Sequence, residues 1–512
     1  MRSANSPSRY LAAIDLGSNS FHLVVAKFQQ QTLHIKAKHR AKTELAANIN
    51  DNGYLNLNAL HAAYDCLAHF GTVLKQTSPV LVRALGTKTL RDARNLQDFL
   101  HRAEALLGYP IEVISGREEA RLIYLGAAKA IPAHFTSHFV VDIGGGSTEI
   151  ILGEQQLPQQ LNSLTMGCVT FKRRFFSHNR ITHEAMNRAQ AAAFAKLLPL
   201  REQYTQTSWQ VAVASSGTAQ TVISVLTAMG LASQDLITHE ALLRLRKRLI
   251  QEEDLNTLAL PGLAPERAAI LPAGVAILCA IFSAFKLNEV HYVKGALREG
   301  ILYDLHQRLG KADPRYESVT HLCERFDLTA TPELWCTAKH HLQTLAPEWH
   351  FTQEQHQFLD WAMQLSQLGT TVAQHHYQRH GAYFLRAVDL AGFSQQEQQI
   401  LAFLVEAHRG EFPLNAWQQL PSSQQTLWGQ LALIFRFAQL ERQARGYYEA
   451  IGISALSKTQ LHVDITAPAT AACDTHALWE QLLANENHAL RHTPFRFSYT
   501  ICQGAEPRAS HK

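Results

Sequence analysis

The sequence AAIDLGSNSFHLVVA at residues 12–26 has the pattern of a β-strand, a tight turn and a second β-strand. The sequence VVDIGGGSTEIILG at residues 140–153 repeats this pattern. In each copy, an apolar run ends in Asp and is followed by a turn rich in Gly, Ser or Asn. We therefore expect two related α/β lobes that face each other, with these turns at their interface. The two copies pair Asp15 with Asp142, Gly17 with Gly144, and Ser20 with Ser147.

The residues of the two turns suit the binding of phosphate. Glycine permits positive φ, and small residues let backbone N–H groups approach phosphate oxygens. Acidic residues at the same turns would repel a bare phosphate, so they predict Mg²⁺ between carboxylate and phosphate. Gly-rich hairpin turns with solvent-facing Asp are the alternative, but turn chemistry alone does not require the matched Asp and Ser. The side-chain donors are Ser18, Asn19, Ser20, Ser147 and Thr148, and the carboxylates are Asp15, Asp142 and Glu149.

The rest of the chain divides into an α/β part and a largely helical part. Periodicity and turn residues indicate the boundaries of the elements, and strand patterns fade after about residue 311. In the first part we expect helices at 57–75, 95–107, 183–204, 239–251 and 266–285, and strands at 80–85, 111–114 and 211–214. From 311 to 447 we expect helices, including 353–367 and 394–406. After that we expect strands at 461–465 and 495–501, with a helix at 476–485 between them.

Length and composition indicate a globular protein of several domains. The 512 residues are 46% hydrophobic and 18% charged, which excludes a disordered chain. A length of 512 residues predicts about three or four domains. Residues 1–310 carry 32 Lys and Arg against 24 Asp and Glu, and residues 311–512 carry 15 against 19. The basic first part is a weak indication of a polyanionic partner.

Cysteine spacing and hydropathy bear on the compartment. The seven cysteines are widely spaced and form no CxxC, so we expect reduced thiols of a cytoplasmic protein. The most apolar stretch, residues 268–285, is interrupted by Pro272 and Gly274, and a buried helix is favoured over a membrane span. We expect no integral membrane segment, while peripheral membrane association stays open. The basic stretch at 244–248 lacks aromatic interleaving, so we expect no nucleic-acid site.

The two turns and five further blocks resemble the exopolyphosphatase / guanosine pentaphosphatase family of the actin–sugar kinase–Hsp70 superfamily. DLGSNSFH at 15–22 and DIGGGSTE at 142–149 are similar to the two phosphate loops of that family. The long members of the family also have a helical portion like that after residue 311. The further blocks follow the family order: GTKTLR at 86–91, SGREEAR at 115–121, MGCV at 166–169, ASSGT at 214–218 and GALREG at 295–300.

The resemblance implies an α/β fold with four domains. Two ribonuclease H-like lobes of the actin-like ATPase type are followed by an all-α HD-like domain and a small α+β C-terminal domain. The expected division is a tail at 1–10, a first lobe at 11–130, a second lobe at 131–310, the helical domain at 311–450 and the C-terminal domain at 451–512. The resemblance also implies a homodimer.

The resemblance assigns Glu119 as the general base that activates water against the terminal phosphorus. A carboxylate between two phosphate-filled loops should have its pKa perturbed by its surroundings. An ordinary acidic residue at the start of a helix is the alternative, because an acid there interacts favourably with the helix dipole. Glu118 is the neighbouring residue that could hold this role instead.

Further site residues follow from the same blocks. Arg91 matches an arginine that contacts substrate phosphate, and a guanidinium can bind two phosphate oxygens at once. Arg267 is a second candidate for a phosphate contact, with a surface arginine as the alternative reading. Asp142 and Glu149, with Asp15 as a third, are the expected Mg²⁺ ligands. The expected phosphate-binding residues are Gly17, Ser18, Asn19, Ser20, Gly144, Gly145, Gly146, Ser147, Gly217 and Arg267.

The helical portion resembles a domain distantly related to HD phosphohydrolases. An active HD site needs an adjacent His-Asp pair as metal ligands, and the corresponding place reads Leu365-Ser366-Gln367-Leu368-Gly369. We therefore predict no second hydrolase there. His375, His376, His380 and His408 lie nearby in sequence, but a metal site without a carboxylate partner is disfavoured. Whether these histidines bind a metal stays open.

The function that the resemblance implies is exopolyphosphatase activity: processive, Mg²⁺-dependent hydrolysis of terminal phosphate from inorganic polyphosphate, releasing orthophosphate. The first alternative is the conversion of guanosine pentaphosphate (pppGpp) to ppGpp, alone or as a dual activity. The triple glycine at 144–146 and GTKTLR favour the polyphosphatase, whereas residues 166–169 and 266–282 are at least as similar to the other branch. An ATP-binding kinase or actin-like protein on the same fold is the more remote alternative.

Overall fold

The computed structural model describes residues 10–29, 32–50, 52–205, 209–232, 235–309, 313–329, 332–468 and 474–503. The chain forms two compact units, residues 1–314 and 315–512. The predicted tail at 1–10 lies outside the described residues except for Tyr10, and so does Cys473. The division into four domains stays a prediction.

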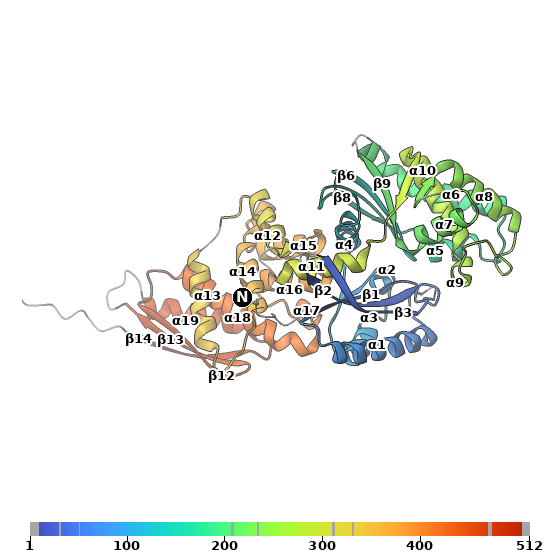
Figure 1. Cartoon of the computed structure of the whole chain (residues 1–512). Coiled ribbons are helices and arrows are strands. Elements are labelled where there is room, and N and C mark those ends of the chain that lie inside the picture. Colours follow the sequence, from blue (N-terminus) through green and yellow to red (C-terminus); the bar gives the residue numbers. More distant parts are fainter. Residues whose placement is uncertain are drawn as a thin grey trace, which may run out of the picture. The chain divides into compact units, whose positions relative to one another are not determined.

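The first unit contains two sheets of related topology, which confirms the internal repeat read from the sequence (Figure 1). In the first sheet, β1 pairs antiparallel with β2 and parallel with β4. In the second sheet, β6 pairs antiparallel with β7 and parallel with β9. The β1–β2 and β6–β7 turns are the two Asp-containing turns.

The strand orders and bounds are as follows. The first sheet has the order β3-β2-β1-β4-β5: β1 Leu11–Leu16, β2 Ser20–Gln29, β3 Thr32–Lys42, β4 Leu81–Gly86 and β5 Ile111–Val113. The second has the order β10-β11-β9-β6-β7-β8: β6 Ser137–Ile143, β7 Thr148–Glu154, β8 Leu157–Leu164, β9 Val211–Ser215, β10 Leu236–Thr238 and β11 Glu289–Tyr292.

Helices α4 (Gly116–Ala128) and α11 (Leu297–Leu309) join the two sheets through one hydrophobic core. This core includes Ala13 of β1, Val140 of β6 and Val213 of β9. Two glycines allow a very close approach here, because a Cβ at Gly126 would lie 2.1 Å from the Ala296 carbonyl oxygen and one at Gly300 1.8 Å from that of Leu122. The GALREG block therefore includes a glycine that lets α11 approach α4 closely.

The outer faces of the two sheets are covered by the remaining helices of this unit. Buried residues of α1 and α3 pack with β1 and β2, and those of α6, α8 and α10 pack with β6. The bounds are α1 Leu57–Thr77, α2 Lys88–Asp92, α3 Leu96–Leu107, α5 Cys168–Phe175, α6 His183–Thr205, α7 Ser216–Ala228, α8 His239–Glu252, α9 Pro265–Ala268 and α10 Leu271–Phe285.

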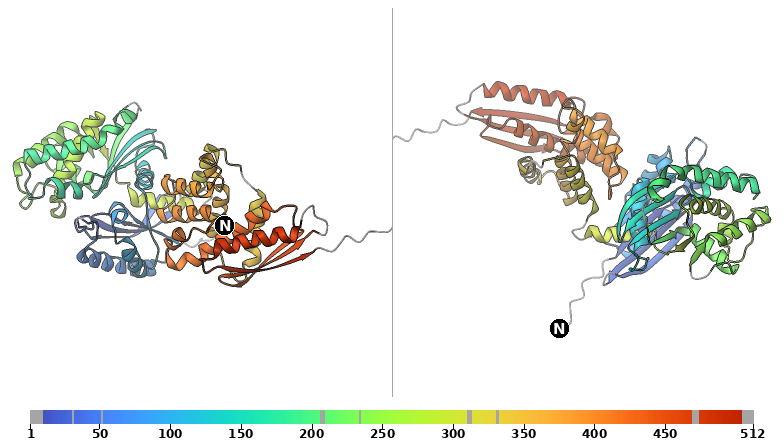
Figure 2. Two further views of the ribbon diagram at one scale, coloured as in Figure 1. Left: turned by 180° about the vertical axis from the view of Figure 1, so that it is seen from behind. Right: turned by 90° about the horizontal axis from the view of Figure 1, so that it is seen from above.

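The second unit is helical with a three-stranded sheet, and both parts share one core. Figure 2 shows α19 along this sheet, in red, where Trp479 and Leu483 pack with Ile453 and Val463. The bounds are α12 Pro314–Arg325, α13 Pro332–Leu345, α14 Gln353–Gln364, η1 Leu368–Thr371, α15 Tyr377–Ala387, α16 Gln395–Ala407, α17 Leu414–Gln418, α18 Ser422–Gln443, β12 Ala450–Ser457, β13 Gln460–Ala467, α19 Thr475–Leu490 and β14 Arg496–Gln503.

The structure differs from the expected elements in two respects. The helix expected at 266–285 is two helices, α9 and α10, with Pro272 in the first turn of α10, where a missing N–H costs no intrahelical bond. Strands β3, β8, β10, β11 and β12 and helices α2, α5, α7 and α11 were not expected. Where the structure describes the chain, no helix is both long and apolar enough to cross a membrane.

Candidate active site

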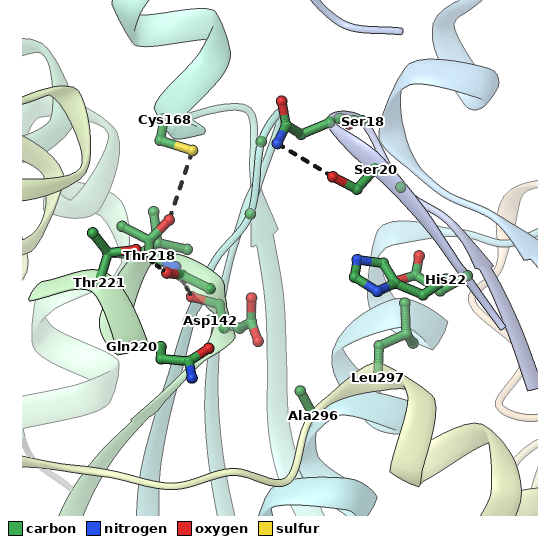
Figure 3. A pocket seen from close by; sticks show the side chains of 18 of the residues that line it. Ser18, Ser20, His22, Asp142, Cys168, Thr218, Gln220, Thr221, Ala296 and Leu297 are labelled. Atoms are coloured by element: carbon green, nitrogen blue, oxygen red, sulfur yellow. Dashed lines mark hydrogen bonds between the residues drawn. The ribbon is translucent and has the colours of Figure 1, made fainter. Parts of the chain in front are cut away.

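A cavity of about 530 Å³ lies at the two Asp-containing turns. Figure 3 shows Ser18, Ser20 and His22 on one side and Asp142, Thr218 and Thr221 on the other. Arg91 and Thr148 do not line this cavity, and the other predicted site residues do: Asp15, Gly17, Ser18, Asn19, Ser20, Glu119, Asp142, Gly144, Gly145, Gly146, Ser147, Glu149, Gly217 and Arg267.

The two turns lie in contact with each other. A Cβ at Gly145 would lie 3.0 Å from Cβ of Ser18, and one at Gly146 would lie 3.0 Å from Ser18 Oγ. The hydroxyl of Thr89, in the GTKTLR block, donates to Ser18 Oγ over 2.8 Å. Ser18 is therefore held between the second turn and α2, and the small residues of the second turn permit this approach.

The start of α4 directs two neighbouring glutamates to different surroundings. Ser115 caps the helix, because its hydroxyl accepts a bond from the Glu118 N–H at 3.1 Å. Glu118 is buried, and its carboxylate receives two bonds from Arg121, at 2.7 and 2.8 Å. Glu119 lines the cavity. Of the two glutamates, only Glu119 can meet a bound substrate.

The ion pair of Glu118 belongs to a buried charge network. Arg121 and Arg83 both donate to Asp304 of α11, at 2.5 and 2.7 Å. The surrounding arginines lower the pKa of Asp304 against the effect of its burial, so it stays ionised. The network fixes α4 against β4 and α11, which holds Glu119 at a defined place on the cavity wall.

Arg91 does not line the cavity but contacts Glu119. Its Nη2 lies 3.4 Å from Glu119 Oε2, and its Nη1 donates to the Ile114 carbonyl. Burial raises the pKa of Glu119 to about 7, and the Arg91 charge opposes part of this rise. A carboxylate with a pKa near neutrality suits a general base at physiological pH. This arrangement is compatible with the role predicted for Glu119, whereas the phosphate contact predicted for Arg91 stays a prediction, because Arg91 does not line the cavity.

Four carboxylates share the cavity: Asp15, Glu119, Asp142 and Glu149. Burial, opposed by the Arg298 charge and reinforced by the Asp142 carboxylate, raises the pKa of Asp15 to about 7. Burial also raises the pKa of Asp142 to about 6, against the hydrogen bond from Ser215. The pKa of Glu149 is raised well above its usual value by burial and by the charges of Glu119 and Asp142. Positive charge brought among these groups would lower all four values.

Two hydroxyl groups orient the predicted metal ligands. Ser215 donates to Asp142 Oδ2 at 2.5 Å, and Ser163 donates to Glu149 Oε1 at 2.7 Å. Hard oxygen donors of this kind fit Mg²⁺. In the described part of the chain, however, no three His, Cys, Asp or Glu side chains are already gathered as a metal site. The donor chemistry fits the ion, and the ligand assignment stays a prediction.

Arg267 lies against Gly217 at the start of α7. A Cβ at Gly217 would lie 3.1 Å from Arg267 Nη2. The guanidinium donates to Thr221 at 3.2 Å and to Thr218 at 3.5 Å. Ser216 adopts a φ of +82°, a strained conformation for a residue with a side chain. Arg267 is half-buried on the cavity wall, which argues against the alternative of a surface arginine.

Sequence reasoning missed several basic residues that line the cavity. Lys38 and Arg40 of β3 line it together with Arg298 and His22. Arg298 Nη1 lies 2.9 Å from Nδ1 of His22, and because a guanidinium can only donate, Nδ1 accepts and the ring proton is on Nε2. His22 and Arg298 stand in blocks that carried the resemblance, so a search of those blocks for cations could have found Arg298.

The histidines of the second unit have separate surroundings. His408 is buried, its Nδ1 bonds to the Val405 carbonyl at 2.6 Å, and its ring stacks on Phe435. Burial lowers the pKa of His408 to about 3. His375 and His376 are exposed neighbours whose rings lie 3.8 Å apart. His408 is thus a neutral core residue, and it supplies no positive charge near neutral pH.

Comparisons with known proteins agree with this architecture. Residues 24–309 match the Ppx/GppA phosphatase family, and residues 315–487 match domain III of Ppx/GppA phosphatases. An exopolyphosphatase structure from Cytophaga hutchinsonii is similar with a TM-score of 0.53 and 24% identity, over 58% of this chain and 97% of that chain. A PPX-GPPA enzyme structure from Aquifex aeolicus has a TM-score of 0.50 and 24% identity, over 58% and 99%. At this identity the structural likeness shows the fold.

Proposed function

The chain belongs to the Ppx/GppA phosphatase family, and from this premise we propose that it hydrolyses the terminal phosphoanhydride of inorganic polyphosphate and releases orthophosphate. The observation that carries the proposal is the position of Glu119 in a cavity lined by both Asp-containing turns. A carboxylate among phosphate-binding turns suits the activation of water rather than the binding of a second substrate.

In the proposed reaction, Glu119 accepts a proton from a water molecule while the water oxygen bonds to the terminal phosphorus. The bond from that phosphorus to the bridging oxygen breaks, and the shortened chain leaves with the electron pair. A general base placed in this way contributes about 10²- to 10⁴-fold in rate. Arg91 contacts the Glu119 carboxylate, with its Nη2 at 3.4 Å from Oε2.

The turns would bind the oxygens of the terminal phosphate through backbone N–H groups and the hydroxyls of Ser18, Ser20 and Ser147. Asp142, Glu149 and Asp15 would hold Mg²⁺. When bound, Mg²⁺ would neutralise charge on phosphate and polarise its oxygens. The four carboxylates with raised pKa values support this part of the proposal, because a cation would relieve their mutual repulsion. The homodimer implied by the resemblance and the cytoplasmic location inferred from the cysteines stay predictions.

The test measures phosphate release from long-chain polyphosphate, pppGpp and ATP, each with Mg²⁺ and again with a chelator. We expect Mg²⁺-dependent release from polyphosphate. Phosphate release from pppGpp alone would show that the substrate is pppGpp, the alternative within the same family, and not polyphosphate. Release from ATP alone, with neither other substrate cleaved, would overturn the proposal.

A further inference from the structure

The cavity is lined by both acidic and basic side chains. Four carboxylates lie around the predicted reaction centre. Lys38 and Arg40 lie on β3, the edge strand of the first sheet, and also line the cavity. A linear polyanion that extends beyond the phosphoryl group being cleaved needs positive charge beyond the reaction centre. Lys38 and Arg40 can supply this charge.

The register of β3 shows why these two side chains face the cavity. Arg40 pairs with His22 and Lys42 pairs with Ser20, and both β2 partners line the cavity. Side chains two apart on a strand share a face, so Lys38 belongs to the same row. The opposite face of β3 carries Ala37 and Ala41, which pack on the core of the first lobe.

Lys38 and Arg40 have no carboxylate partner among the residues that the structure describes. Lys42, the next residue of the row, does have one, because its Nζ lies 2.8 Å from Glu44 Oε1. The charges of Lys38 and Arg40 contribute to lowering the pKa of His22. Burial and the charges of Arg298, Arg40, Lys38 and Arg267 lower its pKa to about 3. An anion bound beside Lys38 and Arg40 would therefore not have to displace an ion-pair partner.

We propose that Lys38 and Arg40 bind the phosphoryl groups of polyphosphate that follow the one being cleaved. The uncleaved part of the bound polyphosphate would then extend out of the cavity along β3. This inference rests on the proposed function, because it assigns a direction to the substrate within the same site. It makes the two residues determinants of affinity for chains, with no part in bond cleavage.

Basic residues on an edge strand also prevent pairing with other chains, and β3 offers a control for this general role. Lys36 is exposed on the same strand, lies over the ring of Tyr10 at 4.2 Å, and does not line the cavity. If charge on β3 serves only solubility, Lys36→Ala and Lys38→Ala should behave alike.

The test compares kcat and KM for long-chain polyphosphate and tripolyphosphate in Lys38→Ala, Arg40→Ala, Lys38→Arg and Lys36→Ala. Loss of a charge-assisted contact to phosphate should raise KM for the long chain about tenfold in each of the first two variants, with kcat changed less than about twofold. KM for tripolyphosphate should rise less, and Lys38→Arg should keep most of the affinity. An unchanged KM, an equal effect of Lys36→Ala, or a fall confined to kcat would overturn the assignment.

A binding measurement separates this inference from the proposed function. In the Glu119→Gln background, we expect labelled long-chain polyphosphate to bind about tenfold more weakly when Lys38 or Arg40 is also replaced by Ala. If the wild-type enzyme releases no phosphate from either chain, the proposed function fails, and this binding experiment still decides the role of β3. Equal binding by all variants would contradict that role.

Discussion

The Nη2 atom of Arg91 lies 3.4 Å from Oε2 of Glu119, and these residues come from different helices, α2 and α4. Burial raises the pKa of Glu119, and the positive charge of Arg91 is the largest influence that lowers it. Arg91 therefore lowers the pH above which the proposed base is ionised, against the larger effect of burial.

Replacing Arg91 should move the pH profile. In Arg91→Gln the pKa of Glu119 should rise further above the value of about 7 in the intact protein. A general base acts in its ionised form, so activity is present above its pKa and is lost as the pH falls through it. The acidic limb of kcat/KM should therefore shift to higher pH. Arg188→Gln, an exposed change on α6, is the control, and an unshifted limb in Arg91→Gln would contradict the electrostatic role.

Glu118→Gln should lower the stability of the fold, whereas Glu119→Gln should lower the rate of phosphate release. Glu118→Gln breaks a buried ion pair with Arg121, and such a loss costs about 3–5 kcal/mol. We expect a lower free energy of unfolding in urea, with activity retained in proportion to the folded fraction. A fully folded but inactive Glu118→Gln variant, together with an active Glu119→Gln variant, would mean that the base assignment is wrong.

The close approach of α4 and α11 depends on glycine. A Cβ at Gly126 would lie 2.1 Å from a backbone carbonyl oxygen, which cannot move without the chain. Gly126→Ala should therefore destabilise the fold by about 1–3 kcal/mol and reduce activity by displacing Glu119. Gly452→Ala is the matched control, because its nearest contact would be at 3.8 Å. Equal thermal stability of the two variants would contradict the packing described.

The stability of the second unit should depend on pH through His408. Its pKa is about 3 in the folded protein and near 6.5 in the unfolded chain, so only the unfolded chain gains a proton between these values. Stability is therefore full above pH 6.5 and falls by about 2 kcal/mol by pH 5. His408→Gln should have a smaller loss over this range in calorimetry. The exposed His321→Gln is the control, and equal pH dependence in both variants would contradict the assignment.

The two Asp-containing turns could be predicted because the sequence pattern that indicates them is local. A strand ending in Asp and a turn of small residues are both visible in sequence, and the repeat at 142–149 reinforced the one at 15–22. The register of the sheets confirms the pairing, since Asp15 lies opposite His22 and Asp142 opposite Glu149. Most of the predicted site residues meet at one cavity for this reason.

The features of the site that could not be predicted depend on contacts between residues far apart in the sequence. The different surroundings of Glu118 and Glu119 depend on Asp304, which binds Arg121 across 183 residues. Strand β3 alternates the apolar residues Leu33, Ile35, Ala37 and Ala41 with polar ones, which is a strand pattern that our sequence reasoning overlooked. Its place at the edge of the sheet, and hence the direction of Lys38 and Arg40, follows from pairing with β2.

The most direct test of the account compares wild-type protein with Glu119→Gln on long-chain polyphosphate and Mg²⁺. Single-turnover phosphate release and equilibrium binding are measured on the same preparations. We predict that release falls by about 10²- to 10⁴-fold while the affinity for polyphosphate changes little, because the change removes the base and leaves the cavity intact. Phosphate release by Glu119→Gln at the wild-type rate would contradict the central claim.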